Sequence, residues 1–498
     1  MFALIPTVFA ETFTPFYLFI MLLATFGGLL VGVIPGLTST MAVGLLVPLT
    51  FGMAMDLSLL ILVSVYVGAL SGGFVAATLL NIPGTPANVC TTFDAYPMAK
   101  SGQAGRALGF GVLASFVGTM FGALVLSFIA PVLGRIALGF NAYEYAALII
   151  FTLTCLIAVS GKSLVKGILA ACIGLILSII GLSETDSISR FTFGFSRLEA
   201  GFSLMPVLIG MYAISQILDD VKDIHAPFKV TSATFTLRDF IQVVKESTAS
   251  VGNLLRSSAI GVSIGVLPAI GPNVASIMAY AKAKNASKEP ETFGKGNRDG
   301  VLASESANSA CVPGCFVPLM TLGIPGDGTT AMLLGAFIIH GVQPGPLLFR
   351  DHPDLFLVVL LALFISAMFI LFLQINCIRL LIKALLIPRY ILYPLILGMC
   401  VLGCFALNSN MFDVWVFLAM GIAGYALQRL DFPLLPLILG LILGQMAERH
   451  LSAAWLISGH SFWGVFDRPI AMGFLVVSVI SVIISLRSRS KQKQKMNF

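Results

Sequence analysis

The chain has few charged residues. Only 10% of its 498 residues are Asp, Glu, Lys or Arg, and 58% are hydrophobic. A soluble domain carries roughly a quarter of its residues charged, so this composition excludes an ordinary soluble protein. Apolar stretches of about 20 residues, enough to cross about 30 Å of hydrocarbon, occur at 57–80, 107–130, 355–375 and 470–486. The sequence predicts an all-α polytopic membrane protein with about ten to twelve transmembrane helices, some of them half-crossings.

Motifs of catalysis and metal binding are also missing. The chain contains no HExxH, GxSxG or Walker motif and no CxxC, so we expect no enzyme activity, no cofactor and no metal beyond a coupling Na⁺. The eight cysteines lie in apolar segments and should pack, reduced, as small hydrophobes. The net charge of +6 comes largely from loops and the tail RSRSKQKQK, which does not call for a nucleic-acid partner. The start, MFALIPTVFAETF, lacks a basic n-region, so we expect no cleaved signal peptide.

One apolar passage occurs twice. Residues 70–88, LSGGFVAATLLNIPGTPAN, align without a gap with residues 312–330, VPGCFVPLMTLGIPGDGTT, at an offset of 242. Each copy is an apolar run broken by Ile-Pro-Gly. An interrupted hydrophobic segment at matching places in two halves is a sequence signature of a transporter's binding site.

A second match defines two homologous halves. Gly32-Val33-x-Pro35 recurs as Gly265-Val266-x-Pro268. We predict a first repeat over 1–220, with a hairpin at 16–52 and a broken helix at 57–89. A charged connector, 221–250, leads to a second repeat over 251–498, with a hairpin at 251–281 and a broken helix at 301–349. About 30 residues cannot cross the membrane twice at 1.5 Å per residue, so 251–281 is expected to be re-entrant.

Loop charges orient the halves in opposite senses. The loop at 281–300 carries five basic residues, whereas its counterpart at 50–57 carries none and contains Asp56. Basic loops prefer the cytoplasm, so the repeats should be inverted, with the connector and the C-terminus cytoplasmic. The presence of two matching hairpins leads to the hypothesis that transport uses an elevator-type movement of the unit that holds the hairpins and breaks.

The breaks are the predicted binding site. Interrupted backbone survives in a membrane only where it faces protein or a water-filled cavity. Helix N-termini that follow the breaks suit a carboxylate, and released carbonyls suit Na⁺ or a proton carrier. The candidate substrate-binding residues are Pro35, Gly36, Thr38, Ser39, Thr40, Gly84, Thr85, Asn88, Gly271, Pro272, Asn273, Ser276, Gly326, Thr329 and Thr330. The alternative is that Pro and Gly only kink packed helices.

Three further residues are candidates for the coupling ion. Glu305 and Asn308 share a helical face just before the second break, and Asp327 lies at that break. Glu305 is interpreted either as a cation or proton carrier or as a residue at the membrane boundary. Asp327 either coordinates a cation or repels a dianion. Arg256 is expected to extend to the cytoplasmic face.

Four passages resemble the large membrane subunit of tripartite tricarboxylate transporters, the TctA family. They are GVIPGLTSTMAVGLLVPLTFGM (32–53), LLNIPGTPANVCTTFDAYPMAKSGQAGRALG (79–109), GVLPAIGPNVASIMAYAKAKNASKEPETFGKGNRDGV (265–301) and ESANSACVPGCFVPLMTLGIPGDGTTAMLLGAFIIHGVQPGPLLF (305–349). The resemblance implies secondary transport in the bacterial inner membrane, driven by Na⁺ or H⁺. It also implies a small membrane subunit (TctB-like) and a periplasmic solute-binding protein (TctC-like) that delivers a di- or tricarboxylate.

This chain departs from the family pattern at the second break. The family's sequence there reads more like IPGSATTA, whereas Asp327-Gly328 stands here in place of Ser-Ala. Citrate is therefore not assumed as the substrate. The rival function is a non-translocating scaffold or channel-like subunit, which predicts that changes at the breaks leave uptake untouched.

Overall fold

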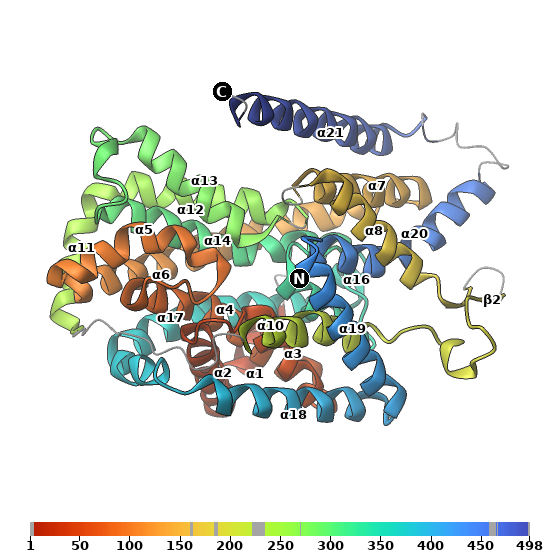
Figure 1. Ribbon diagram of the computed structural model, residues 1–498, viewed down its shortest axis with the longest axis horizontal. Helices are drawn as coiled ribbons and strands as arrows, with labels where there is room; N and C mark the ends of the chain where they lie inside the picture. The colour runs from red at the N-terminus through yellow and green to blue at the C-terminus, as the bar shows by residue number, and fades with distance from the viewer. Residues whose placement is uncertain are drawn as a thin grey trace. The chain divides into compact units, whose positions relative to one another are not determined.

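The computed structural model describes residues 4–159, 163–183, 188–221, 235–268, 270–457, 465 and 467–496. Within these residues, strand structure is limited to an antiparallel pair, β1 (Gly181–Leu182) with β2 (Ser189–Arg190). Almost everything else is helix (Figure 1). The prediction of an all-α polytopic membrane protein is confirmed.

Seven helical segments of the described residues are long and apolar enough to cross a membrane. They are Pro15–Val33, Met55–Leu80, Pro86–Ala137, Pro353–Ala384, Arg389–Asn408, Met411–Arg429 and Leu434–Ile457. Shorter apolar helices lie at Ser39–Thr50, Ala142–Thr154, Leu164–Ser178, Gly328–Ile339 and Pro469–Ser481. Full and partial crossings are therefore both available to this chain.

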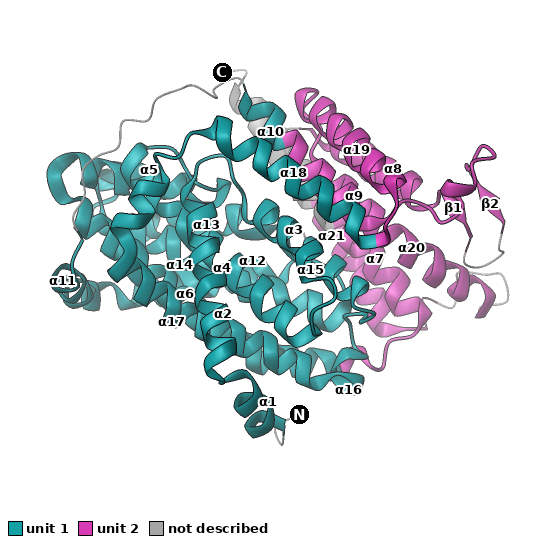
Figure 2. Cartoon of the chain, turned by 90° about the horizontal axis from the view of Figure 1, so that it is seen from below, with its two compact units in different colours: residues 1–135, 216–407 teal, residues 136–215, 408–498 magenta. Residues whose placement is uncertain are grey.

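The chain forms two compact units, shown in different colours in Figure 2. Unit 1 comprises residues 1–135 and 216–407. Its main helices are α1 (Ile5–Thr12), α2 (Pro15–Val33), α3 (Ser39–Thr50), α4 (Met55–Leu80), α5 (Val89–Met98), α6 (Ala104–Ala137), α10 (Ser215–Asp220), α11 (Leu237–Ser247), α12 (Val251–Val266), α13 (Gly271–Ala286), α14 (Arg298–Leu322), α15 (Gly328–Ile339), α16 (Leu348–Asp351), α17 (Pro353–Ala384) and α18 (Arg389–Asn408). Short 3₁₀ turns precede α5 (η2, Pro86–Asn88), α12 (η7, Thr248–Ser250) and α14 (η8, Pro290–Thr292), and a π-turn precedes α6 (η3, Ala99–Gln103).

Unit 2 comprises residues 136–215 and 408–498. Its helices are α7 (Ala142–Val159), α8 (Leu164–Ser178), α9 (Leu204–Ile209), α19 (Met411–Arg429), α20 (Leu434–Ile457) and α21 (Pro469–Met496), with a 3₁₀ turn η4 (Ser196–Leu198) and a π-turn η5 (Gly210–Ile214). Helix α8 packs on α20, and α7 packs on α20 and α21. Each unit takes segments from both predicted repeats.

The two interrupted helices, α4 and α14, form the buried core of unit 1. Every residue of α4 from Ser58 to Leu80 is buried except the half-buried Ile61, and every residue of α14 from Gly300 to Thr321 is buried. Helix α14 is too polar to count among the seven apolar spans. A polar helix is tolerated at membrane depth where it contacts protein rather than lipid. The core of unit 1 is therefore where polar chemistry can be placed.

Both core helices end in the same way. Helix α4 stops at Asn81 and α14 at Gly323, each in the left-handed conformation, with φ of 59° and 71°. These residues occupy equivalent positions at the 242-residue offset. A side chain at Gly323 would meet the carbonyl of Pro344, which explains why glycine stands there and asparagine does not. The predicted breaks therefore lie at 81–85 and 323–327.

Glycines fasten each hairpin to its core helix at equivalent positions. A Cβ on Gly28 or Gly32 of α2 would strike the backbone oxygens of Val65 or Ala69 on α4. A Cβ on Gly261 or Gly265 of α12 would likewise strike those of Ala307 or Cys311 on α14, and these are the residues at matching repeat positions. Figure 1 shows α12, α13 and α14 side by side. The two repeats thus share one packing pattern, while their inverted orientation stays a prediction.

The hairpins have short second arms. Helix α2 has 19 residues and α3 has 12, while α12 and α13 have 16 each. At 1.5 Å per residue, α3 reaches only about 18 Å, too short for a full crossing. The turns lie near Pro35 and Pro268, and Ala269 falls outside the described residues. In the connector, α11 is described and residues 222–234, including Lys222 and Lys229, are not.

Candidate functional site

The second break is closed by an aspartate. Asp327 caps α15: its Oδ1 accepts bonds from the Thr330 amide (2.8 Å) and the Thr330 hydroxyl (2.6 Å), while Thr330 Oγ1 accepts from the Asp327 amide (2.8 Å). The Tyr66 hydroxyl of α4 donates to Oδ2 at 2.7 Å. Donors and the helix dipole therefore stabilise a negative charge here without a cation. This pattern favours the interpretation that Asp327 sets the local charge over the one in which it coordinates a cation.

Three hydroxyl groups join the first hairpin to the second break. Thr329 Oγ1, on the first turn of α15, lies 2.9 Å from Ser39 Oγ and 3.1 Å from Thr40 Oγ1, on the first turn of α3. All three residues are buried. Three hydroxyls supply three protons, and the two bonds within this hydroxyl trio use two of them. One donor therefore remains for an external acceptor such as a carboxylate.

The first break has neither the charge nor a side-chain cap on the helix backbone. Thr85 and Asn88 stand at the positions equivalent to Asp327 and Thr330, and the Thr85 hydroxyl donates to Asn88 Oδ1 at 2.6 Å. The backbone amide of Gly84 donates to Gly73 on α4 at 3.2 Å. The two breaks thus differ by one negative charge at the same repeat position.

Glu305 contacts the first break rather than solvent. It is fully buried in α14, and its Oε1 accepts a bond from Asn88 Nδ2 at 3.0 Å and one from the Thr91 hydroxyl. Its Oε2 accepts from Asn308 Nδ2 at 3.3 Å. The interpretation of Glu305 as a residue at the membrane boundary does not fit this burial.

The polar residues around Asp327 and those around Asn88, here called the two clusters, lie along one face of α4. Tyr66 contacts Asp327, and Gly73 lies against Asn88. Seven residues, two helical turns, separate Tyr66 from Gly73, which is about 10 Å along the axis. The neutral break and the charged break are therefore neighbours in the core of unit 1.

The other predicted residues are placed as follows. Thr38 caps α3 through a bond from the Met41 amide at 3.2 Å. Gly271 lies against Asp327, with a hypothetical Cβ 3.2 Å from the Asp327 Cβ, and Gly326 lies against Cys315. Pro272 and Ser276 are buried in α13, whereas Asn273 is exposed and is not brought to either cluster by a described contact. Arg256 bonds Asn253 at 2.7 Å rather than a site carboxylate.

The tip of the first hairpin contacts α10 and α18. Arg389 donates to the carbonyl of Pro35 at 3.3 Å, and Gly36 lies against the Asp220 carboxylate. That carboxylate accepts from the Tyr393 hydroxyl at 2.9 Å. Pro35 and Gly36 are therefore held by side chains instead of facing the clusters directly.

Sequence reasoning missed Tyr66, Thr91 and Asp94. Tyr66 stands at the repeat position of Asn308, so the 242-residue offset could have found it. Asp94 Oδ1 accepts three backbone N–H groups, from Gly294 (2.8 Å), Gly296 (3.0 Å) and Asn297 (2.7 Å). A buried carboxylate of α5 thereby fixes the loop before α14. No local sequence pattern predicts this contact.

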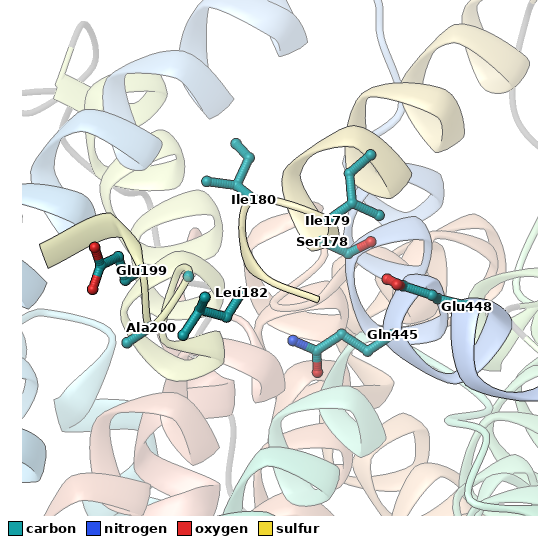
Figure 3. A pocket seen from close by; sticks show the side chains of 9 residues that line it. Ser178, Ile179, Ile180, Leu182, Glu199, Ala200, Gln445 and Glu448 are labelled. Atoms are coloured by element: carbon teal, nitrogen blue, oxygen red, sulfur yellow. The ribbon is translucent and has the colours of Figure 1, made fainter. Parts of the chain in front are cut away.

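Unit 2 contains a separate cavity of about 300 Å³ (Figure 3). It is lined by Ser178, Ile179, Ile180, Leu182, Glu199, Ala200, Gly201, Gln445 and Glu448. Glu448 is paired with Arg190 at 2.8 Å. Two carboxylates in the lining make this cavity a poor receptor for an anion, so the clusters in unit 1 are the better candidate site.

Comparison with known proteins identifies the family. The model of the tripartite tricarboxylate transporter TctA family matches residues 18–439. The chain belongs to the TctA family. An Agrobacterium vitis protein, "Uncharacterized 52.8 kDa protein in TAR-I ttuC' 3'region", is 36% identical over 475 residues, covering 95% of this chain and 93% of the relative. A second Agrobacterium vitis protein, "Uncharacterized protein in TAR-II ttuC' 3'region", is 37% identical over 238 residues, covering 48% of this chain and 98% of that protein. No solved structure matches the chain.

Membership in the TctA family makes the chain a subunit of a tripartite tricarboxylate transporter and a multi-pass membrane protein. The family is one of transporter subunits rather than a known family of enzymes. The matched range includes both breaks, the second hairpin and all but the first residues of the first hairpin.

Proposed function

We propose that this TctA-family chain is the translocating subunit of a secondary transporter that imports a small di- or tricarboxylate. A periplasmic binding protein would deliver the substrate, a small membrane subunit would complete the complex, and a gradient of Na⁺ or H⁺ would drive uptake. The chain would lie in the bacterial inner membrane with its C-terminus in the cytoplasm.

The observation that carries this proposal is the hydroxyl trio of Ser39, Thr40 and Thr329. It joins a hairpin of the first repeat to the break of the second, and it keeps one donor free. The first turn of α15 adds the positive end of a helix dipole beside it. A buried group of donors at interrupted helices is what a carboxylate requires.

Replacing Thr329 with Val tests the proposal. Valine has nearly the shape of threonine but no hydroxyl, so uptake should fall about tenfold or more, the cost of losing a hydrogen bond to a charged group. Uptake of radiolabelled succinate, malate and citrate would be measured in proteoliposomes that contain the chain, the small membrane subunit and the loaded binding protein.

Thr321→Val is the matched control. Thr321 is also buried, but its hydroxyl only returns to the carbonyl of Val317 in its own helix, at 2.7 Å. Equal uptake by wild type, Thr329→Val and Thr321→Val, with the complex intact, would favour the scaffold function instead.

A further inference from the structure

The two oxygens of the Glu305 carboxyl group are unequally satisfied. Oε1 accepts two bonds, from Asn88 Nδ2 and from the Thr91 hydroxyl. Oε2 accepts one long bond of 3.3 Å from Asn308 Nδ2. Among the described residues, the free bonding capacity of this carboxyl group is therefore concentrated on Oε2.

Asn308 has an unsatisfied acceptor at the same place. It is fully buried, and its Oδ1 has no hydrogen-bond partner among the residues that the structure describes. Rotating an amide by half a turn exchanges its oxygen and nitrogen. In that orientation Oδ1 would face Oε2, and two acceptors at this distance need a proton between them.

The surroundings of Glu305 supply no described counter-charge. Helix α14 contacts α4, α5, α12, α13, α15, α16 and η2 and, through Gly118 and the apolar core, α6 and α11. The charged residues of α16, Arg350 and Asp351, pair with each other at 2.7 Å. The titratable group that faces Glu305 is the Cys90 thiol of α5. The other charged or titratable groups of these helices near the core have different partners: Asp94 with Tyr280, Tyr66 with Asp327, Arg256 with Asn253, and Arg106 with Glu246. Lys282 and Lys284 of α13 are exposed.

We propose that Glu305 carries one proton on Oε2, shared with Asn308 Oδ1, and that this proton is the coupling ion. The proposal rests on the proposed function, because a coupling ion presupposes transport. An O–H bond forms when the carboxylate takes a proton from one side and breaks when it releases the proton to the other. No electrons are transferred.

A proton fits this site better than a metal cation does. A hard metal cation collects about six oxygen ligands. Here Asn88 Nδ2 and the Thr91 hydroxyl present hydrogen-bond donors to Oε1, which leaves Oε2 and Asn308 Oδ1 as the oxygens with free capacity. A proton needs only those two atoms.

The position of Glu305 couples the proton to the substrate. Asn88 bonds Glu305 through Nδ2 and receives the Thr85 hydroxyl at Oδ1, so two hydrogen bonds link the carboxyl group to the first break. An ionised Glu305 repels a carboxylate bound at the neighbouring hydroxyl trio, and protonation removes the repulsion. By linkage, the bound substrate raises the proton affinity by the same factor. Val63 occupies the equivalent position in the first repeat, so the repeats provide one such proton site between them.

Glu305→Gln tests the proposal, because glutamine keeps the size and an acceptor but cannot release a proton. Infrared difference spectra of the purified chain, taken between alkaline and acidic buffers, should lose a protonated-carboxyl band in Glu305→Gln. The matched control is Asp413→Asn in α19, a buried carboxylate that accepts from Asn408 at 2.6 Å, and it should keep the band. In proteoliposomes with labelled succinate, malate and citrate, Glu305→Gln should still exchange substrate across the membrane. The accumulation of substrate that a pH gradient drives should be at least tenfold lower than in wild type.

Each failure has a distinct meaning. An unchanged band together with pH-driven accumulation in Glu305→Gln overturns the proton assignment and leaves the proposed function standing. A band that Na⁺ abolishes at constant pH also overturns it, in favour of Na⁺. If wild type takes up none of the three carboxylates, the proposed function fails while the infrared result still reports on Glu305. Should Glu305→Gln not fold, Asn308→Ala must move the appearance of the band to lower pH, and an unmoved band refutes the shared proton.

Discussion

Asp327 places a negative charge where the first break has the neutral Thr85. The charge is stabilised by Thr330, Tyr66 and the start of α15, so the local fold tolerates it. The Thr329 hydroxyl, at the proposed anion site, lies only two residues away. The same side chain that starts the helix therefore also sets the electrostatic potential that a substrate encounters.

Replacing Asp327 with Ser should change substrate preference. Serine also caps helices, so α15 should still start at this residue, but the charge is gone. A unit charge about 8 Å from another, at an effective dielectric constant of about 20, contributes roughly 2 kcal/mol, or about thirtyfold. Competition uptake of citrate against succinate should shift toward citrate by up to that factor.

If the citrate-to-succinate ratio of Asp327→Ser equals that of wild type, Asp327 acts only as a helix cap. Asp56→Ser, which removes a carboxylate that accepts from Tyr17 at the start of α4, controls for a general change in net charge.

At the scale of elements, the hairpins and core helices are held by backbone contact at glycine. Any side chain at Gly32 or Gly265 meets the carbonyl of Ala69 or Cys311. A carbonyl of a packed helix cannot move aside as the end of a flexible side chain can. The two hairpins should therefore respond alike to the same substitution.

Gly32→Ala and Gly265→Ala should both destabilise the protein, by about 1–3 kcal/mol each, because overpacking separates the helices. Gly27→Ala on α2 and Gly252→Ala on α12 are matched controls, since a Cβ at either meets nothing within 4 Å. In these controls alanine should be neutral or stabilising, as it favours helix. Thermal unfolding in detergent would measure the difference, and equal stability of all four variants would contradict the packing described.

At the scale of the whole molecule, the inverted orientation of the repeats remains to be measured. Lys288→Cys, in the basic loop before α14, should react with a membrane-impermeant thiol reagent only from the cytoplasmic side. Ala54→Cys, in the equivalent loop before α4, should react only from the periplasmic side. Both positions are exposed, and the exposed native Cys172 is replaced with Ala as background. Labelling of both loops from one side would rule out inversion.

Much of the architecture could be predicted because its signals are local. Proline and glycine weaken a helix, and their duplicated combinations made the turns near Pro35 and Pro268 and the breaks after Leu80 and Leu322 predictable, although Pro313 and Pro318 stay inside α14. Contacts between helices could not be predicted from such local signals. The bond from Tyr66 to Asp327 and that from Asn88 to Glu305 depend on which helices cross in the core of unit 1. Asn273 shows the same limit, because the exposed face of α13 depends on its rotation.

The cap at the second break bears on how such proteins diversify after gene duplication. Serine, threonine, asparagine and aspartate all start helices well, so position 327 can exchange among them while α15 keeps its start. Each exchange involving aspartate alters the charge beside the breaks, and each is independent of the other copy. A lineage that carries this duplicated break can therefore explore new anionic nutrients one codon at a time, without passing through an unfolded ancestor.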